Sequence, residues 1–93
     1  METMTSGKNQ SKLPKWFKGD VYHKGDTVRN PFSGEEFYLN RYELSMYDFI
    51  KGAQFIIEMN KGQVSTSKII DEFHKGLRWF SKNNINAYMV LLD

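Results

Sequence analysis

Aspartate and histidine occur together twice in this 93-residue chain, each time three residues apart. Asp20 and His23 lie among β-forming residues, and Asp71 and His74 lie in a predicted helix. Carboxylate oxygen and imidazole nitrogen are ligands that zinc or manganese accepts. On the helix, however, Asp71 and His74 share a side with Arg78, and nearby positive charge opposes the binding of a cation. We therefore expect a solvated helix face, and we predict neither a metal nor another cofactor.

The sequence offers no other arrangement typical of catalysis. No serine lies in a Gly-x-Ser-x-Gly elbow, and the absence of cysteine excludes a thiol nucleophile and a disulfide scaffold. The neighbouring carboxylates of Glu35 and Glu36 point to opposite faces of a strand, so they do not form an acid–base couple. The glycines are isolated and make no phosphate-binding loop. We therefore predict that the protein is not an enzyme.

The amino-terminal region has a composition that would suit nucleic-acid binding. A run without acidic residues contains Lys8, Lys12, Lys15, Trp16, Phe17 and Lys18. Lysines neutralise phosphates and aromatic rings stack on bases, a combination that proteins use to bind single strands. The alternative is a solubilising arm whose aromatic residues anchor it on the core. We prefer this alternative because the net charge is only +2, and auxiliary nucleic-acid binding is our second hypothesis for the function.

A surface for protein contacts is predicted on a helix over about residues 40–60. Phe55 points away from the apolar side of this helix, with Gly52 and Met59 beside it. Such residues on an otherwise polar face indicate a second packed surface, and Tyr38 and Tyr42 are candidates to extend it. Either the hairpin or the carboxy-terminal helix covers this surface within the monomer, or it binds a second copy or another protein. We rank a small non-enzymatic accessory or protein-interaction protein first.

The elements that carry these residues fit one small domain. The chain has 40% hydrophobic and 15% aromatic residues, which favours a folded core. Residues 1–14 predict a flexible basic arm, and residues 15–93 predict a single α+β domain. In this domain an amino-terminal β-hairpin or small meander packs on two amphipathic helices and a short carboxy-terminal helix. No stretch resembles a secretory signal or a membrane span, so we expect a cytoplasmic protein without membrane binding.

Turn residues predict the β region. The sequence Asn-Pro-Phe-Ser-Gly at residues 30–34 is typical of a hairpin turn, because Pro31 presets one backbone angle and Gly34 permits a left-handed residue. Val28 would then lie opposite Phe37. The segment 20–23 is a candidate for a third short strand.

Caps and apolar periodicity predict the helices. Asn40-x-x-Glu43 and Ser45-x-x-Asp48 both have the spacing of a helix start, and one of residues 65–67 would start the next helix. Asn84 would cap the last helix. The residues expected on the core-facing stripes are Met46, Phe49, Ile50, Ala53, Ile56 and Ile57 in the first helix, and Ile69, Ile70, Phe73, Gly76, Leu77 and Phe80 in the second. Gly76 would admit the close approach of another backbone or of Trp79.

Blocks at residues 30–35, 43–52, 75–80 and 86–93 carry a resemblance to a known group. Together they resemble small conserved proteins of tailed bacteriophages that infect marine cyanobacteria, over about residues 20–93. Members of that group open the last short helix with proline, whereas this chain has Ile85 there. The resemblance implies a phage-infected bacterial cell as the setting, and it transfers no activity and no site residue.

Overall fold

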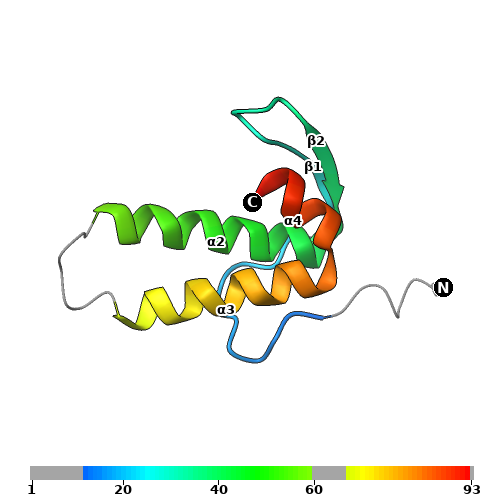
Figure 1. The fold of residues 1–93 in the computed structure, drawn as a ribbon. Coiled ribbons are helices and arrows are strands. Elements are labelled where there is room, and N and C mark those ends of the chain that lie inside the picture. The colour runs from blue at the N-terminus through cyan, green and yellow to red at the C-terminus, as the bar shows by residue number, and fades with distance from the viewer. Residues whose placement is uncertain (1–11, 60–66, 93) are drawn as a thin grey trace.

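The computed structural model describes residues 12–59 and 67–92. These residues form β1 (Asp26–Arg29), β2 (Glu36–Leu39), α2 (Arg41–Met59), α3 (Ser67–Asn83) and α4 (Ile85–Leu91). Helices α2 and α3 lie side by side and antiparallel, and α4 lies between α3 and the hairpin of β1 and β2 (Figure 1). The predicted α+β fold, with a hairpin and three helices, is confirmed.

The hairpin has the predicted turn and register. Val28 pairs with Phe37 in the antiparallel ladder, and Gly34 closes the turn with a φ of 80°, a conformation that glycine adopts without strain. The predicted third strand at residues 20–23 is wrong. The backbone N–H of Tyr22 donates to the side-chain hydroxyl of Ser45 at 2.9 Å, so a contact with α2 replaces strand pairing there.

Helix α2 begins at the first of the two predicted starts. The amide N–H of Glu43 donates to the side-chain oxygen of Asn40 at 2.9 Å, and the Glu43 carboxylate accepts from the Asn40 N–H at 3.0 Å. This reciprocal pair is a capping box. Ser45 is instead a buried residue inside the helix, where its hydroxyl donates to the carbonyl oxygen of Arg41 at 2.7 Å.

The start of α4 agrees with its predicted signal. The side chain of Asn84 accepts a hydrogen bond from the N–H of Ala87 at 3.1 Å, and so it caps α4 as predicted. Helix α3 begins at Ser67, the last residue of the predicted starting window, and residues 65 and 66 lie outside the described part of the chain. Within residues 12–59 and 67–92, no helix combines the length and the apolar character that a bilayer span requires.

The core forms where α2, α3, α4 and β2 meet. Its buried residues are Leu39, Met46, Ile50, Phe80, Ala87 and Leu91. Gly76 of α3 is buried against α2, because a Cβ built on it would lie 3.1 Å from the Cγ1 of Ile50 and 3.3 Å from the sulfur of Met46. The close approach predicted at Gly76 therefore exists, but side chains of α2 make it rather than a backbone or Trp79.

Two predicted boundaries of the core change in the structure. Ile56 was expected to face the core, yet 44% of it is exposed, because the buried residues of α2 extend only from Glu43 to Ala53. Leu13 was assigned to the flexible arm, yet it is half-buried and packs against the core cluster. The packed part of the chain therefore includes Leu13, while residues 1–11 lie outside the described residues.

Candidate protein-interaction surface

One side of the first half of α2 is covered by an earlier segment of the same chain. The ring centroids of Trp16 and Phe17 lie 5.8 Å and 5.5 Å from that of Phe49. Further along this segment, Tyr22 is held by the hydrogen bond from its backbone N–H to the hydroxyl of Ser45. This part of α2 is therefore occupied by contacts within the monomer.

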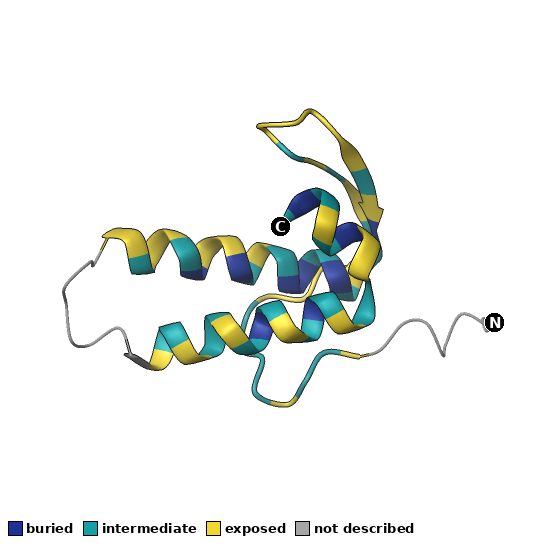
Figure 2. Cartoon of the chain, in the orientation of Figure 1, coloured by how far each residue is buried: buried dark blue, intermediate teal, exposed yellow. Residues whose placement is uncertain are grey.

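The second half of the outer side of α2 carries exposed apolar residues. Gly52, Phe55, Ile56 and Met59 follow the spacing that places residues on one side of a helix, and we call these four residues the α2 stripe. Phe55 is 62% exposed, Ile56 44% and Met59 67%, while a Cβ on Gly52 would meet no atom within 4 Å. Figure 2 shows the exposed residues along this half of the helix.

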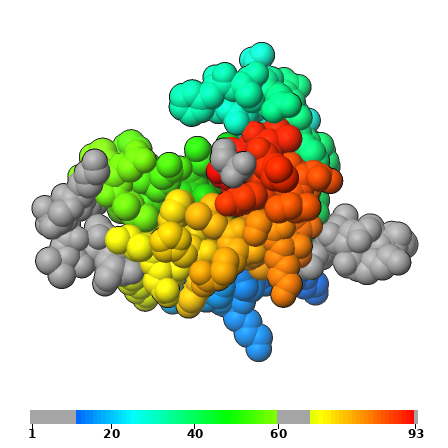
Figure 3. Space-filling view, in the orientation of Figure 1, coloured from blue at the N-terminus to red at the C-terminus, as the bar shows by residue number. Residues whose placement is uncertain are grey.

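The turn of the hairpin adds a further aromatic residue. Phe32 is 96% exposed, and the hairpin tip that carries it projects over α2 (Figure 3). Asn30 holds this tip in place: its side-chain oxygen accepts from the N–H of Phe32 at 2.8 Å, and its side-chain nitrogen donates to the carbonyl oxygen of Val90 at 2.8 Å. The exposed ring is therefore carried by a turn that is tied to α4.

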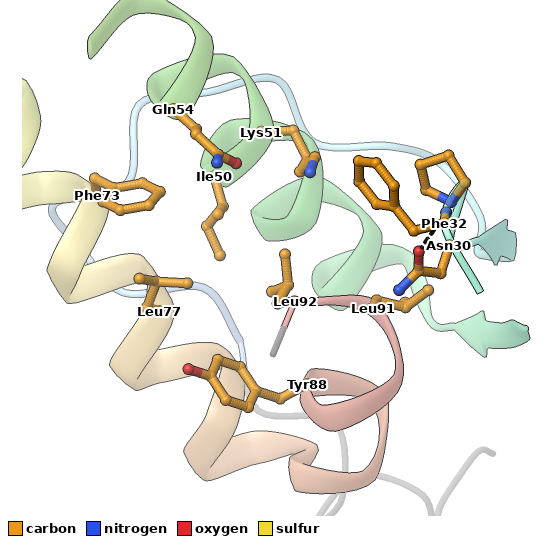
Figure 4. A pocket seen from close by; sticks show the side chains of 11 residues that line it. Asn30, Phe32, Ile50, Lys51, Gln54, Phe73, Leu77, Tyr88, Leu91 and Leu92 are labelled. Atoms are coloured by element: carbon orange, nitrogen blue, oxygen red, sulfur yellow. Dashed lines mark hydrogen bonds between the residues drawn. The ribbon is translucent and has the colours of Figure 1, made fainter. Parts of the chain in front are cut away.

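A groove separates the hairpin tip from α2. It has a volume of about 330 Å³, and its lining residues are Phe32, Lys51, Gln54, Phe55 and Glu58. An adjoining pocket of about 250 Å³ shares three of these residues and reaches Ile50, Phe73, Leu77, Tyr88, Leu91 and Leu92 (Figure 4). The groove thus combines apolar walls with one cationic and one anionic residue at its rim, a combination suited to binding a polypeptide.

The two tyrosines proposed to extend this surface lie elsewhere. Tyr38 is 61% exposed on the outward face of β2, and its hydroxyl lies next to Gly25. Tyr42 is half-buried in the first turn of α2, where the guanidinium of Arg41 lies 4.7 Å from its ring centroid. Phe55 follows Tyr42 by thirteen positions along the helix, which is about 20 Å. Their extension of the α2 surface is therefore not supported by the geometry.

The candidate nucleic-acid-binding residues separate into two groups. Lys12, Lys15 and Lys18 are exposed, whereas Trp16 and Phe17 are half-buried and pack against the core. The rings thus contact Phe49 in the way expected of an arm anchored on the domain. Lys8, the remaining candidate residue of this run, lies outside the described residues.

The Asp–His pairs show no grouping around a common point. The carboxylate of Asp71 forms an ion pair with the ammonium of Lys75, with 3.4 Å between the nitrogen and the oxygen. The ring centroid of His74 lies 5.5 Å from that of Phe73. In residues 12–59 and 67–92, no three or more His, Cys, Asp or Glu side chains are close enough to hold one metal ion.

Two tyrosines near the start of α2 have altered acidity. The hydroxyl of Tyr22 donates to the carboxylate of Asp48 at 3.0 Å, and this hydrogen bond, followed by the negative charge of Asp48, raises the pKa of Tyr22 above its ordinary value. Burial raises the pKa of Tyr47, with a smaller contribution from Asp48. Both shifts favour the neutral phenol, so neither tyrosine is prepared to act as a base at neutral pH.

Comparison of the chain with protein-family models, with curated proteins and with solved structures finds no match. The candidate surface is therefore described by its geometry alone. The sequence led to Gly52, Phe55 and Met59, but it did not lead to Phe32, Lys51, Gln54 or Glu58. Phe32 sits in a turn, and nothing in the local sequence indicates that the turn projects over α2.

Proposed function

We propose that this protein is a non-enzymatic interaction module that binds another polypeptide through the α2 stripe and the adjacent groove. The observation that carries the proposal is the exposure of Phe32 and Phe55 on the two sides of one groove, with the exposed Met59 further along α2. Exposed aromatic and methionine side chains are favoured at the centres of protein interfaces. Lys51 and Glu58 supply the polar rim that such interfaces have.

The experiment compares three forms of the tagged chain in the cells that produce it. Phe55→Asp puts a charge in the stripe, and Met89→Asp changes a residue of α4 that is equally exposed, at 61%. We expect a polypeptide that copurifies with the native chain and with Met89→Asp to be lost from Phe55→Asp. Identical sets of copurifying polypeptides with all three forms would contradict the proposal.

The setting that we propose is the cytoplasm of a phage-infected bacterial cell, on the strength of the resemblance described above. Infected cyanobacterial cells are accordingly the material in which the copurification is best attempted.

A second candidate function is auxiliary binding of nucleic acid. The observation that favours it is the exposure of Lys12, Lys15 and Lys18 on one short segment, since exposed lysines neutralise phosphates. Retention on single-stranded DNA that falls with rising salt, and that is lost when the three lysines are replaced by alanine, would support it. Retention that is absent at low salt would exclude it.

A further inference from the structure

We propose that the partner of the α2 stripe is a second copy of this chain, bound with the two α2 helices antiparallel. This inference rests on the proposed function and names its partner. In the dimer, Phe55 of each copy packs against Gly52 of the partner subunit, and Lys51 of each copy faces Glu58 of the partner subunit.

The first support is the spacing of the stripe. Gly52, Phe55 and Met59 follow one another at intervals of three and four residues, which is the pattern of a seam between two packed helices. Helix α2 carries this seam in addition to the one that packs into the core, where Met46, Ile50 and Ala53 are buried. A helix with two apolar sides is suited to packing against two neighbours at once.

The second support is the match between a large and a small residue. When the two-fold axis of an antiparallel pair passes between Gly52 and Phe55, each of these two residues faces the other in the partner. Phe55 then lies opposite Gly52 of the partner subunit. Phe55 is 62% exposed. A Cβ built on Gly52 would have no neighbouring atom within 4 Å, so the space beside this glycine is empty. The aromatic ring of each copy therefore has room beside the glycine of the other.

The third support is the arrangement of charge. Lys51 and Glu58 are seven residues apart, so they lie on the same flank of the seam, and both line the groove. When two helices pack antiparallel, identical flanks meet. Lys51 of one copy is then level with Glu58 of the partner subunit, and symmetry repeats this pair. A parallel pair of helices would instead bring this flank opposite the other flank of the seam, where Ile56 lies, so only the antiparallel orientation pairs these charges.

The central experiment measures molecular mass in solution by sedimentation at increasing concentration, from about 1 µM to about 1 mM. The mass of the native chain is expected to approach twice 11.0 kDa. Phe55→Asp is expected to remain a monomer with an unchanged helical circular dichroism spectrum, while Met89→Asp dimerises like the native chain. A native chain that stays monomeric throughout the range, or equal dimerisation of Phe55→Asp, overturns the proposal.

Charge reversal tests the orientation with variants that leave the apolar stripe intact. Lys51→Glu and Glu58→Lys each replace two attractive pairs by repulsive ones, so each is expected to raise the dimer dissociation constant by about tenfold. An equimolar mixture of the two variants restores attraction at both pairs and is expected to form a heterodimer with native affinity. A mixture that associates no better than its components overturns the antiparallel arrangement.

The outcomes separate this inference from the proposed function on which it rests. If the native chain is a monomer but a different polypeptide is lost from Phe55→Asp during copurification, the second copy is excluded and the interaction module stands. If the native chain dimerises equally with and without Phe55→Asp, and copurification is also unchanged, both fail.

Discussion

The side-chain amide of Asn84 donates to the Glu43 carboxylate at 3.1 Å, and this hydrogen bond joins the first turns of α2 and α4. The other carboxylate oxygen of Glu43 caps α2 through Asn40, while Asn84 caps α4 through Ala87. Glu43 is only 7% exposed. A single buried carboxylate therefore links the capping residues of two helices.

Replacing Glu43 by alanine is expected to lower the free energy of unfolding by about 2–3 kcal/mol, because it removes a cap and leaves the amide of Asn84 without this acceptor. Urea denaturation measures the change. Glu35→Ala is the control, since this glutamate is exposed and its loss should change stability by less than about 0.5 kcal/mol. Combining Glu43→Ala with Asn84→Ala should be less harmful than the sum of the two, and strict additivity would show that the bond contributes nothing.

The features that sequence predicted well are those encoded by neighbouring residues. The turn around Pro31 and Gly34 and the caps at Asn40 and Asn84 each depend on residues within a few positions of one another. These signals were sufficient for the hairpin register and for the start of α4, and they gave the start of α2 as one of two candidates. The fold class followed because the order of such elements restricts the architecture.

The features that sequence missed depend on contacts between distant segments. Tyr22 was expected in a strand, but its backbone N–H bonds to Ser45 on α2. Ile56 continues the apolar period of α2, and only the ends of the neighbouring elements decide that it lies beyond the buried residues. Phe32 enters the candidate surface because the hairpin leans over α2. Periodicity identifies an apolar side of a helix, but it does not show how much of that side is covered.

Two glycines are expected to respond in opposite ways to alanine. A Cβ at Gly25 would collide with the carbonyl oxygen of Leu39 and lie 2.9 Å from the Cα of Asn40. Because backbone atoms cannot move aside as a side chain can, Gly25→Ala should lower the free energy of unfolding by more than about 2 kcal/mol. Gly52 lies exposed in a helix with open space around it, so Gly52→Ala should raise stability by about 0.5–1 kcal/mol.

Thermal and urea unfolding at one low protein concentration check this pair of variants, since association would otherwise add to the apparent stability. Equal effects of the two alanines would contradict the close packing of Gly25 against the start of α2.

The Tyr22–Asp48 pair predicts a loss of stability in alkaline solution. The folded-state pKa of Tyr22 is raised above its ordinary value of 10.0, so the stabilisation from this pair is complete below pH 10 and disappears as the pH rises through the raised value. Asp48→Asn should bring the pKa of Tyr22 down towards the ordinary value. The pKa of Tyr47 should stay raised in this variant, because burial is its main cause.

Nuclear magnetic resonance of ring-labelled tyrosine resolves the two titrations. Asp20→Asn is the graded control, because the charge of Asp20 is the smallest of the contributions to Tyr22. A larger fall in the pKa of Tyr22 with Asp20→Asn than with Asp48→Asn would contradict the assignment of the hydrogen bond as the main cause.

Trp16 distinguishes an anchored arm from a nucleic-acid-binding one. Its ring packs against Phe49, so Trp16→Ala is expected to lower the free energy of unfolding by about 2 kcal/mol, less than for a fully buried tryptophan because Trp16 is half-buried. Lys15→Ala changes the exposed neighbour and should leave stability unchanged. Chemical denaturation and retention on single-stranded DNA are measured for both variants. Stacking on bases requires a ring that is free to leave Phe49. If Trp16→Ala keeps the native stability but is retained more weakly on single-stranded DNA, in a salt-dependent way, the ring contributes to nucleic-acid binding and not to the core.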